Sequence, residues 1–138
     1  MTRKYEQAAR LAEQALGLKD EPATRLLLAR TLLALERYGD ALEVARRLLD
    51  DERQSRQASK IVAASYAGLK DWREALIYLE RLRAEATEAS VLNLAAECHL
   101  NLNEPEKAVP LLRRSLEVDP DQPDIKTLLE TAEKRIKK

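Results

Sequence analysis

The chain has 138 residues, and its 24 basic side chains balance its 24 acidic ones. A molecule without net charge has no overall field that would attract a phosphate backbone or an anionic bilayer, so we expect neither nucleic acid nor membrane as its main partner. Phe is absent and Gly occurs three times, whereas Ala, Leu, Arg and Glu are abundant. These four are strong helix formers, and the composition therefore predicts an all-α fold.

We infer the cellular compartment from apolar segments that the sequence lacks and from its single cysteine. No stretch approaches the about 18 apolar residues that a membrane span needs, and no apolar segment typical of a signal peptide follows Met1. The single Cys98 cannot form an internal disulfide, which permits a reducing compartment. We expect a cytoplasmic protein, although a longer natural precursor with a signal or anchor would look the same over these residues.

Apolar residues at helical spacing predict eight helices in chain order. Pro22 and Pro105 suit first turns, Thr87 and Asn103 suit N-caps, and Asp71 with Glu74 resembles a capping box. A turn is expected at residues 38–40. The predicted helices are 3–17, 22–35, 41–49, 55–68, 72–83, 87–102, 103–118 and 122–138. Pro110 falls inside the seventh, where a missing backbone hydrogen bond predicts a bend.

One stretch recurs along the chain. Residues 69–75 (Leu-Lys-Asp-Trp-Arg-Glu-Ala) have relatives at 35–41 and 102–108, and a shortened copy at 4–8. The alanines that end the four copies are Ala8, Ala41, Ala75 and Ala108, so the spacings are 33, 34 and 33 residues. A fixed period in this range indicates a stacked array of helix pairs rather than a folded enzyme domain.

The residues within each period resemble the tetratricopeptide repeat, whose pattern is W-x-x-L-G-x-x-Y, then A-x-x-x-F, then P. The last copy reads Leu92-x-x-Ala95-Ala96-x-x-His99, then Ala108-x-x-x-Leu112, then Pro120. The copies before it keep the small residues, although Arg25 and Ser59 replace the first large residue and the closing proline is missing.

The resemblance implies a right-handed α-solenoid of antiparallel helix pairs, forming a single domain over residues 1–138. It would contain a half repeat (1–20), three full repeats (22–54, 55–87 and 88–120) and a capping helix (122–138), which covers the core on one side and meets water on the other.

Small side chains at fixed places let the two helices of a pair approach closely. We expect this role for Ala29, Ala63 and Ala96 on the first helices, and for Ala41, Ala75 and Ala108 on the second. Three aromatic residues recur just after the turn, at Tyr5, Tyr38 and Trp72. This recurrence favours packing between neighbouring repeats over ligand stacking.

Cys98 and His99 form the one pair that could suggest catalysis. Adjacent residues on a helix point in different directions, and no second His is present to serve as a base. One Cys and one His also make an incomplete metal-ligand set. We therefore expect packing roles for both residues, no enzymatic activity, no metal and no cofactor.

In arrays of this family the outer stripe of each first helix lines the concave surface, which makes it the candidate binding groove. By the repeat register, the candidate contacts are Leu26, Arg30, Leu33, Lys60, Ala64, Ala67, Asn93, Glu97 and Asn101. Leu26 and Leu33 exceed what one core face of their helix needs, and surplus exposed apolar surface usually marks an interaction site. The alternative is that a neighbouring helix covers both leucines.

These observations favour a protein-interaction scaffold that binds a peptide or a segment of a partner protein in the groove. A self-association module, which would make the chain a homo-oligomer, is the first alternative. A recruiting domain cut from a larger protein or enzyme is the second, and a helical-repeat RNA binder, against which the net charge argues, is the third.

Overall fold

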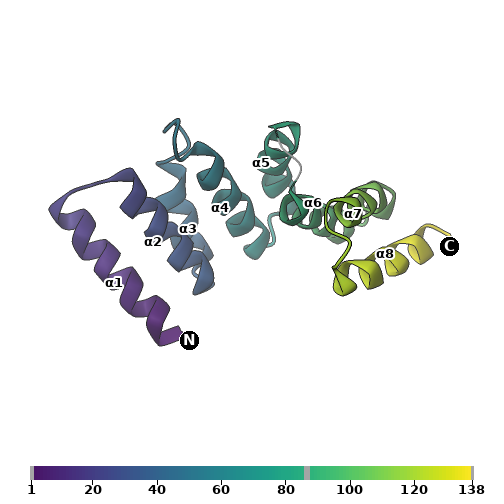
Figure 1. Ribbon diagram of the computed structural model, residues 1–138, viewed down its shortest axis with the longest axis horizontal. Coiled ribbons are helices and arrows are strands. Elements are labelled where there is room, and N and C mark those ends of the chain that lie inside the picture. The colour runs from purple at the N-terminus through teal and green to yellow at the C-terminus, as the bar shows by residue number, and fades with distance from the viewer. Residues whose placement is uncertain (1, 86–87, 138) are drawn as a thin grey trace. The chain divides into compact units, whose positions relative to one another are not determined.

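The computed structural model describes residues 2–85 and 88–137, and over this part of the chain it is helical throughout, without strands (Figure 1). The prediction of an all-α helical repeat is confirmed. The helices are α1 (Thr2–Leu18), α2 (Pro22–Ala34), α3 (Tyr38–Arg46), α4 (Ser55–Gly68), α5 (Trp72–Glu85), α6 (Ala89–Asn101), α7 (Pro105–Val118) and α8 (Pro123–Ile136). Thr87, a predicted N-cap, lies outside the described residues.

The helices form two compact units, Met1–Asp71 and Trp72–Lys138, which are described separately. In the first unit α1 packs on α2, α2 pairs with α3, and α4 packs on both α2 and α3 (Figure 1). In the second unit α5 packs on α6, α6 pairs with α7, and α7 packs on α8. The predicted repeat 55–87 runs across the boundary between the units, so the single domain remains a prediction.

The alanines selected from the repeat pattern are core residues. Ala29 and Ala41 of the α2–α3 pair have no exposed surface, nor have Ala96 and Ala108 of the α6–α7 pair. A methyl group is the largest side chain that allows two helix backbones to approach this closely. The burial of these positions confirms the helix-pair register that the sequence predicts.

The three turns that follow α2, α4 and α6 share one backbone conformation. Glu36, Lys70 and Asn103 adopt left-handed φ values of 60°, 63° and 60°. In the first turn Arg37 N–H donates to Leu32 C=O, and Glu36 N–H donates to Leu33 C=O, both at 2.9 Å. The other two turns repeat this bond pair. The double bond is the Schellman motif, which satisfies the free carbonyl groups at a helix end.

This motif corrects two boundaries. The turn expected at residues 38–40 lies at 35–37, so α3 begins at Tyr38 with Gly39 inside its first turn. Independently of this motif, α3 ends at Arg46 rather than residue 49. The expected N-cap at Asn103 is also wrong. Its left-handed backbone belongs to the Schellman turn, its side-chain oxygen accepts a 2.8 Å hydrogen bond from Arg135 of α8, and Glu104 precedes α7 instead.

Aromatic side chains join consecutive repeats in the first unit. The ring of Tyr38, at the start of α3, lies against Gly68, at the end of α4. Farther along the same pair, the guanidinium of Arg46 donates to the Tyr66 hydroxyl, and its Cζ atom lies 5.7 Å from the centre of the Tyr66 ring. The expected role of Tyr38 in packing between repeats is confirmed.

Candidate functional site

The candidate groove in the first unit consists of the outer stripes of α2 and α4, two helices that pack against each other. On α2, Arg30 is exposed and Leu33 is half-buried; on α4, Lys60 and Ala64 are half-buried. Leu26 and Ala67 are buried. These two packed helices therefore carry an exposed Arg30, a half-buried Leu33 and Lys60, and two buried apolar side chains among the predicted contacts.

The leucine-rich helix α2 divides its side chains differently from the sequence expectation. Leu26, one of the two surplus leucines, is buried, whereas Leu27 beside it is exposed. The pattern could not separate them, because α2 is apolar on nearly all sides and has almost no amphipathic signal. Leu27 is therefore a candidate contact that sequence reasoning missed.

In the second unit, the predicted contact Asn93 belongs to an internal polar network. Its amide Nδ2 donates to Gln122 Oε1 at 2.8 Å, and its Oδ1 accepts from the Ser115 hydroxyl at 2.5 Å. Gln122 Nε2 in turn donates to the carbonyl of Asp119 at 2.8 Å. Since Ser115 is fully buried, this network ties α6, α7 and the approach to α8 together.

Glu97 and Asn101, the other two predicted contacts of this unit, are both exposed on α6. Asn101 Nδ2 donates to the backbone carbonyl of Glu97 at 2.8 Å, one helical turn away. Because this bond uses only the backbone of Glu97, its exposed carboxylate is the acidic group among the predicted contacts.

Cys98 is not placed as a nucleophile. Burial, and secondly the negative charge of Glu97, raise the pKa of its thiol to about 12, so the thiol is protonated at neutral pH. A thiol of this kind is a packing group rather than a reactive one.

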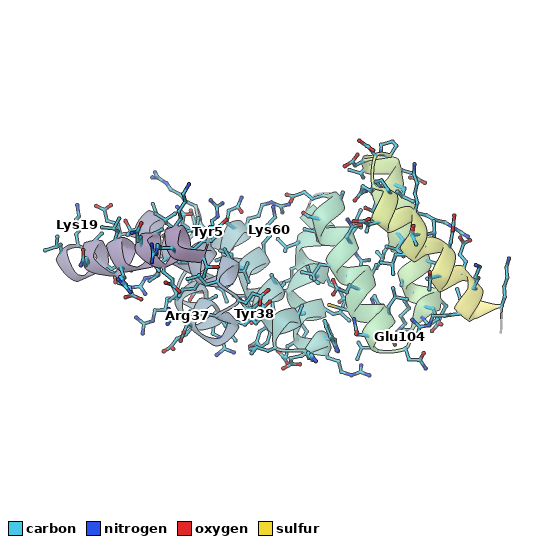
Figure 2. All side chains as sticks on the ribbon, turned by 90° about the horizontal axis from the view of Figure 1, so that it is seen from below. Tyr5, Lys19, Arg37, Tyr38, Lys60 and Glu104 are labelled. Atoms are coloured by element: carbon cyan, nitrogen blue, oxygen red, sulfur yellow. The ribbon has the colours of Figure 1, made fainter. Side chains whose placement is uncertain are left out.

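The neighbouring imidazole has a structural partner of its own. His99 Nδ1 lies 3.1 Å from Glu104 Oε1, and Lys107 Nζ lies 3.1 Å from Glu104 Oε2 (Figure 2 labels Glu104). These hydrogen bonds, that of His99 first, lower the pKa of the Glu104 carboxyl below its usual value. The side-chain bond spans the same turn as the backbone bond from Glu104 N–H to His99 C=O, so His99 fastens the turn between α6 and α7.

Metal sites and membrane spans are both missing from the described part of the chain. No three His, Cys, Asp or Glu side chains among residues 2–85 and 88–137 gather where they could hold a metal ion. None of the helices over these ranges is both long and apolar enough to cross a bilayer. An open pocket of about 660 Å³ adjoins the start of α2, where Ala23 lies beside Glu21 and the acidic residues 50–52.

Comparison with known proteins adds two family matches. The family model described as anaphase-promoting complex, cyclosome, subunit 3 matches residues 1–82, and a tetratricopeptide repeat model matches residues 66–131. No curated protein matches the sequence significantly.

Solved structures resemble the chain over most of its length. A MamA RS-1 ArsTM double mutant aligns with a TM-score of 0.86 and 21% identity, over 96% of this chain and 76% of its own. YrrB, described as a TPR protein with an unusual peptide-binding site, aligns with 0.77 and 17%, over 90% and 65%. PcrH in complex with the chaperone binding region of PopB aligns with 0.67 and 19%, over 85% and 95%. At these identities the likeness is one of fold.

Proposed function

The chain belongs to the tetratricopeptide repeat family, and from this premise we propose that it is a scaffold that binds a peptide segment of a partner protein on the outer stripes of its first helices. The family is generally a non-catalytic fold for protein interaction. PcrH, solved with a region of PopB, and YrrB, with its peptide-binding site, give precedents for such an occupant on this fold.

The observation that carries the proposal is the composition of the stripe on α2 and α4. Arg30 is exposed and forms no ion pair or hydrogen bond with any described residue, so its charge is available to a partner. Leu33 offers a partly exposed apolar anchor, and two further members of the proposed surface, Leu26 and Ala67, are buried. A segment with an apolar anchor beside acidic residues fits this combination, because charge complementarity gives specificity and buried apolar contact gives affinity.

The second unit, taken by itself, carries the remaining proposed contacts on α6. Glu97 and Asn101 are the proposed contacts there, since both are exposed. Asn93 is half-buried, and a bound segment would share its amide with Ser115 and Gln122. Lys60 and Ala64 complete the proposed surface on α4.

A selection from a library of displayed 16-residue peptides tests this function and needs no named partner. Peptides selected on the wild-type protein should bind Arg30→Glu and Leu33→Asp at least about tenfold more weakly, a loss of roughly 1.4 kcal/mol in binding free energy. Arg114→Glu, which reverses an exposed charge on α7, serves as the matched control and should leave the affinity unchanged.

Circular dichroism separates a binding defect from unfolding. Both groove variants should keep the wild-type helix content and melting temperature, because Arg30 is exposed and Leu33 is only half-buried. Selected peptides that bind all three variants equally would refute the groove assignment. Sedimentation at two concentrations addresses self-association, since a peptide receptor of this kind should remain monomeric at both.

A further inference from the structure

The helices that carry the proposed binding surface each hold charges of one sign. Within their bounds, α2 and α4 contain basic residues and no Asp or Glu, whereas α6 contains Glu97 and neither Lys nor Arg. In contrast, α1, α3, α5, α7 and α8 each contain both signs. Mixed signs are typical of a helix that faces water, because neighbouring charges can then pair. The single sign on α2, α4 and α6 is therefore a property of the surface proposed for binding.

One repeat position shows a reversal of charge directly. Arg30, Ala64 and Glu97 are separated by 34 and 33 residues. These are also the spacings of the buried alanines that mark the repeats, so the three residues hold equivalent positions on α2, α4 and α6. Arg30 and Glu97 are both exposed. The first unit thus presents a guanidinium at the position where the second unit presents a carboxylate.

Neither of these two charges is neutralised by the described part of the chain. Among residues 2–85 and 88–137, no side chain forms an ion pair with Arg30 or Glu97. Arg25, the other basic residue of α2, is already bonded to Asp20 at 2.5 Å. Arg30 and Glu97 can therefore each take a partner from a ligand.

Acidic residues near the start of α2 limit where an acidic ligand residue can bind. Glu21 occupies the N-cap position of α2, where a negative charge stabilises the helix N-terminus. The acidic residues 50–52 adjoin Ala23 in the open pocket at this end. Ala23 lies about 10 Å from Arg30 along the helix axis, because seven residues separate them. These acids therefore direct an acidic ligand side chain toward Arg30 and away from the start of α2.

The surroundings of Glu97 suit a basic side chain. Leu94 and Leu100 lie about 60° to either side of Glu97 around α6, and both are half-buried. A lysine or arginine residue can lay its aliphatic stem on such leucines while its cationic head reaches a carboxylate. The exposed part of α6 is thus complementary to a basic residue in charge and in apolar contact.

The charges of α8, in the same unit, do not reverse this preference. Lys126 and Lys134 are exposed, and so are Asp124 and Glu130, so the exposed charges of this helix balance. Its other two charged side chains are bonded to α7 and to the turn before α7. Glu97 is therefore the unbalanced charge of α6 and α8 taken together.

We propose that the ligand is a charge-segregated peptide segment, in which acidic residues bind the first unit through Arg30 and basic residues bind the second unit through Glu97. This inference rests on the proposed function, since it takes the bound peptide from there and assigns the charges of its two portions. A segment of uniform sign would place like charges against Arg30 or against Glu97, and such contacts disfavour wrong partners.

Four synthetic peptides of 16 residues, with leucines at the same places, test the proposal with the full chain. Two carry glutamates in one half and lysines in the other, in opposite orders, so that both chain directions are covered. The third alternates the same glutamates and lysines, and the fourth has glutamate at every charged place. Fluorescence anisotropy at low salt should show that one segregated peptide binds at least about fivefold tighter than the alternating peptide, and added salt should reduce the difference.

Variants of the protein assign the two charges. Glu97→Lys should weaken the better segregated peptide at least about fivefold and strengthen the all-glutamate peptide, and Glu97→Gln should give a smaller loss. Glu117→Lys, which reverses an exposed acidic charge on α7, is the matched control and should leave both affinities unchanged. Arg30→Glu combined with Glu97→Lys should transfer the preference to the segregated peptide of the opposite order. Melting temperatures should stay at the wild-type value, because all three residues are exposed.

The outcomes separate this inference from the proposed function. The inference is overturned if the alternating peptide binds as tightly as both segregated peptides, if none of the four binds, or if Glu97→Lys and Glu97→Gln leave the affinities unchanged. Should library-selected peptides still lose affinity for Arg30→Glu and Leu33→Asp in these cases, the proposed function stands without charge segregation. Library-selected peptides that bind those two variants as tightly as the wild type reject the proposed function itself.

Discussion

The contact between Gly68 and Tyr38 gives a sharp test of how consecutive repeats pack. A Cβ atom added at Gly68 would lie 2.6 Å from Cγ of Tyr38, whereas carbon atoms in ordinary contact are about 3.5–4.0 Å apart. Gly68→Ala therefore forces the tyrosine ring or the end of α4 to move. The sign of the effect on stability depends on two opposed terms.

The first term favours alanine. Gly68 is the last residue of α4 and has no positive φ, so alanine fits its backbone and gains up to about 1 kcal/mol of helix propensity. The second term opposes it, since overpacking a well-packed contact costs typically about 1–3 kcal/mol. We expect the overlap to win because it involves Cγ, Cδ1 and Cε1 along one edge of the ring, and Gly68→Ala should destabilise the protein by about 1 kcal/mol.

A double-mutant cycle isolates the contact. In a Tyr38→Ala background the ring is absent, so Gly68→Ala should become stabilising by about 0.5–1 kcal/mol. Urea unfolding followed by circular dichroism gives the four free energies of unfolding, and thermal melts should shift by roughly 4 °C per kcal/mol. If Gly68→Ala stabilises the wild-type background as much as the Tyr38→Ala background, the ring does not rest on Gly68.

Three further predictions concern other parts of the repeat. Ala108→Leu should cost about 1–3 kcal/mol, because it overpacks the fully buried contact between α6 and α7. Ala8→Leu, at a half-buried position of α1, should change the free energy of unfolding by less than about 0.5 kcal/mol, and urea titrations compare the two variants. Glu36→Gly should raise the melting temperature, because glycine removes about 1 kcal/mol of left-handed backbone cost, and a lower melting temperature would contradict this. As the pH falls below about 4.5, the wild type should lose stability relative to Glu104→Gln. The pKa of Glu104 is lower in the folded than in the unfolded state, so its carboxylate stabilises the folded protein above the unfolded-state pKa, and protonation removes this stabilisation. A difference in the free energy of unfolding that stays the same at every pH in urea titrations would refute this role.

Most of the fold could be predicted because the same sequence pattern recurs along the chain, so each copy supports the helix assignments made from the others. The alanine spacing indicated which helix faces meet, and the predicted bounds 55–68 match α4 residue for residue. The start of α3 was missed because Gly39 suggested a turn by itself. The residue that makes the turn is Glu36, and a left-handed glutamate has no sequence signature.

Side-chain exposure was less predictable than helix position. The register places Leu26 on the outer stripe, but its side chain is buried, and Leu27 is exposed instead. Asn93 likewise occupies a stripe position while its amide serves the network with Ser115 and Gln122. For Asn93, residues outside its own helix decide the outcome, and a pattern within one helix contains no information about them.

The balanced net charge illustrates the same limit for function. Zero overall charge argued against nucleic acid and membranes, and that inference concerns the field at long range. At contact distance the local arrangement of charges matters instead, and Arg30 on α2 is exposed without an ion pair to any described residue. A chain that is neutral as a whole can thus still present a basic surface to a ligand, and the proposed surface with Arg30 and Lys60 is of this kind.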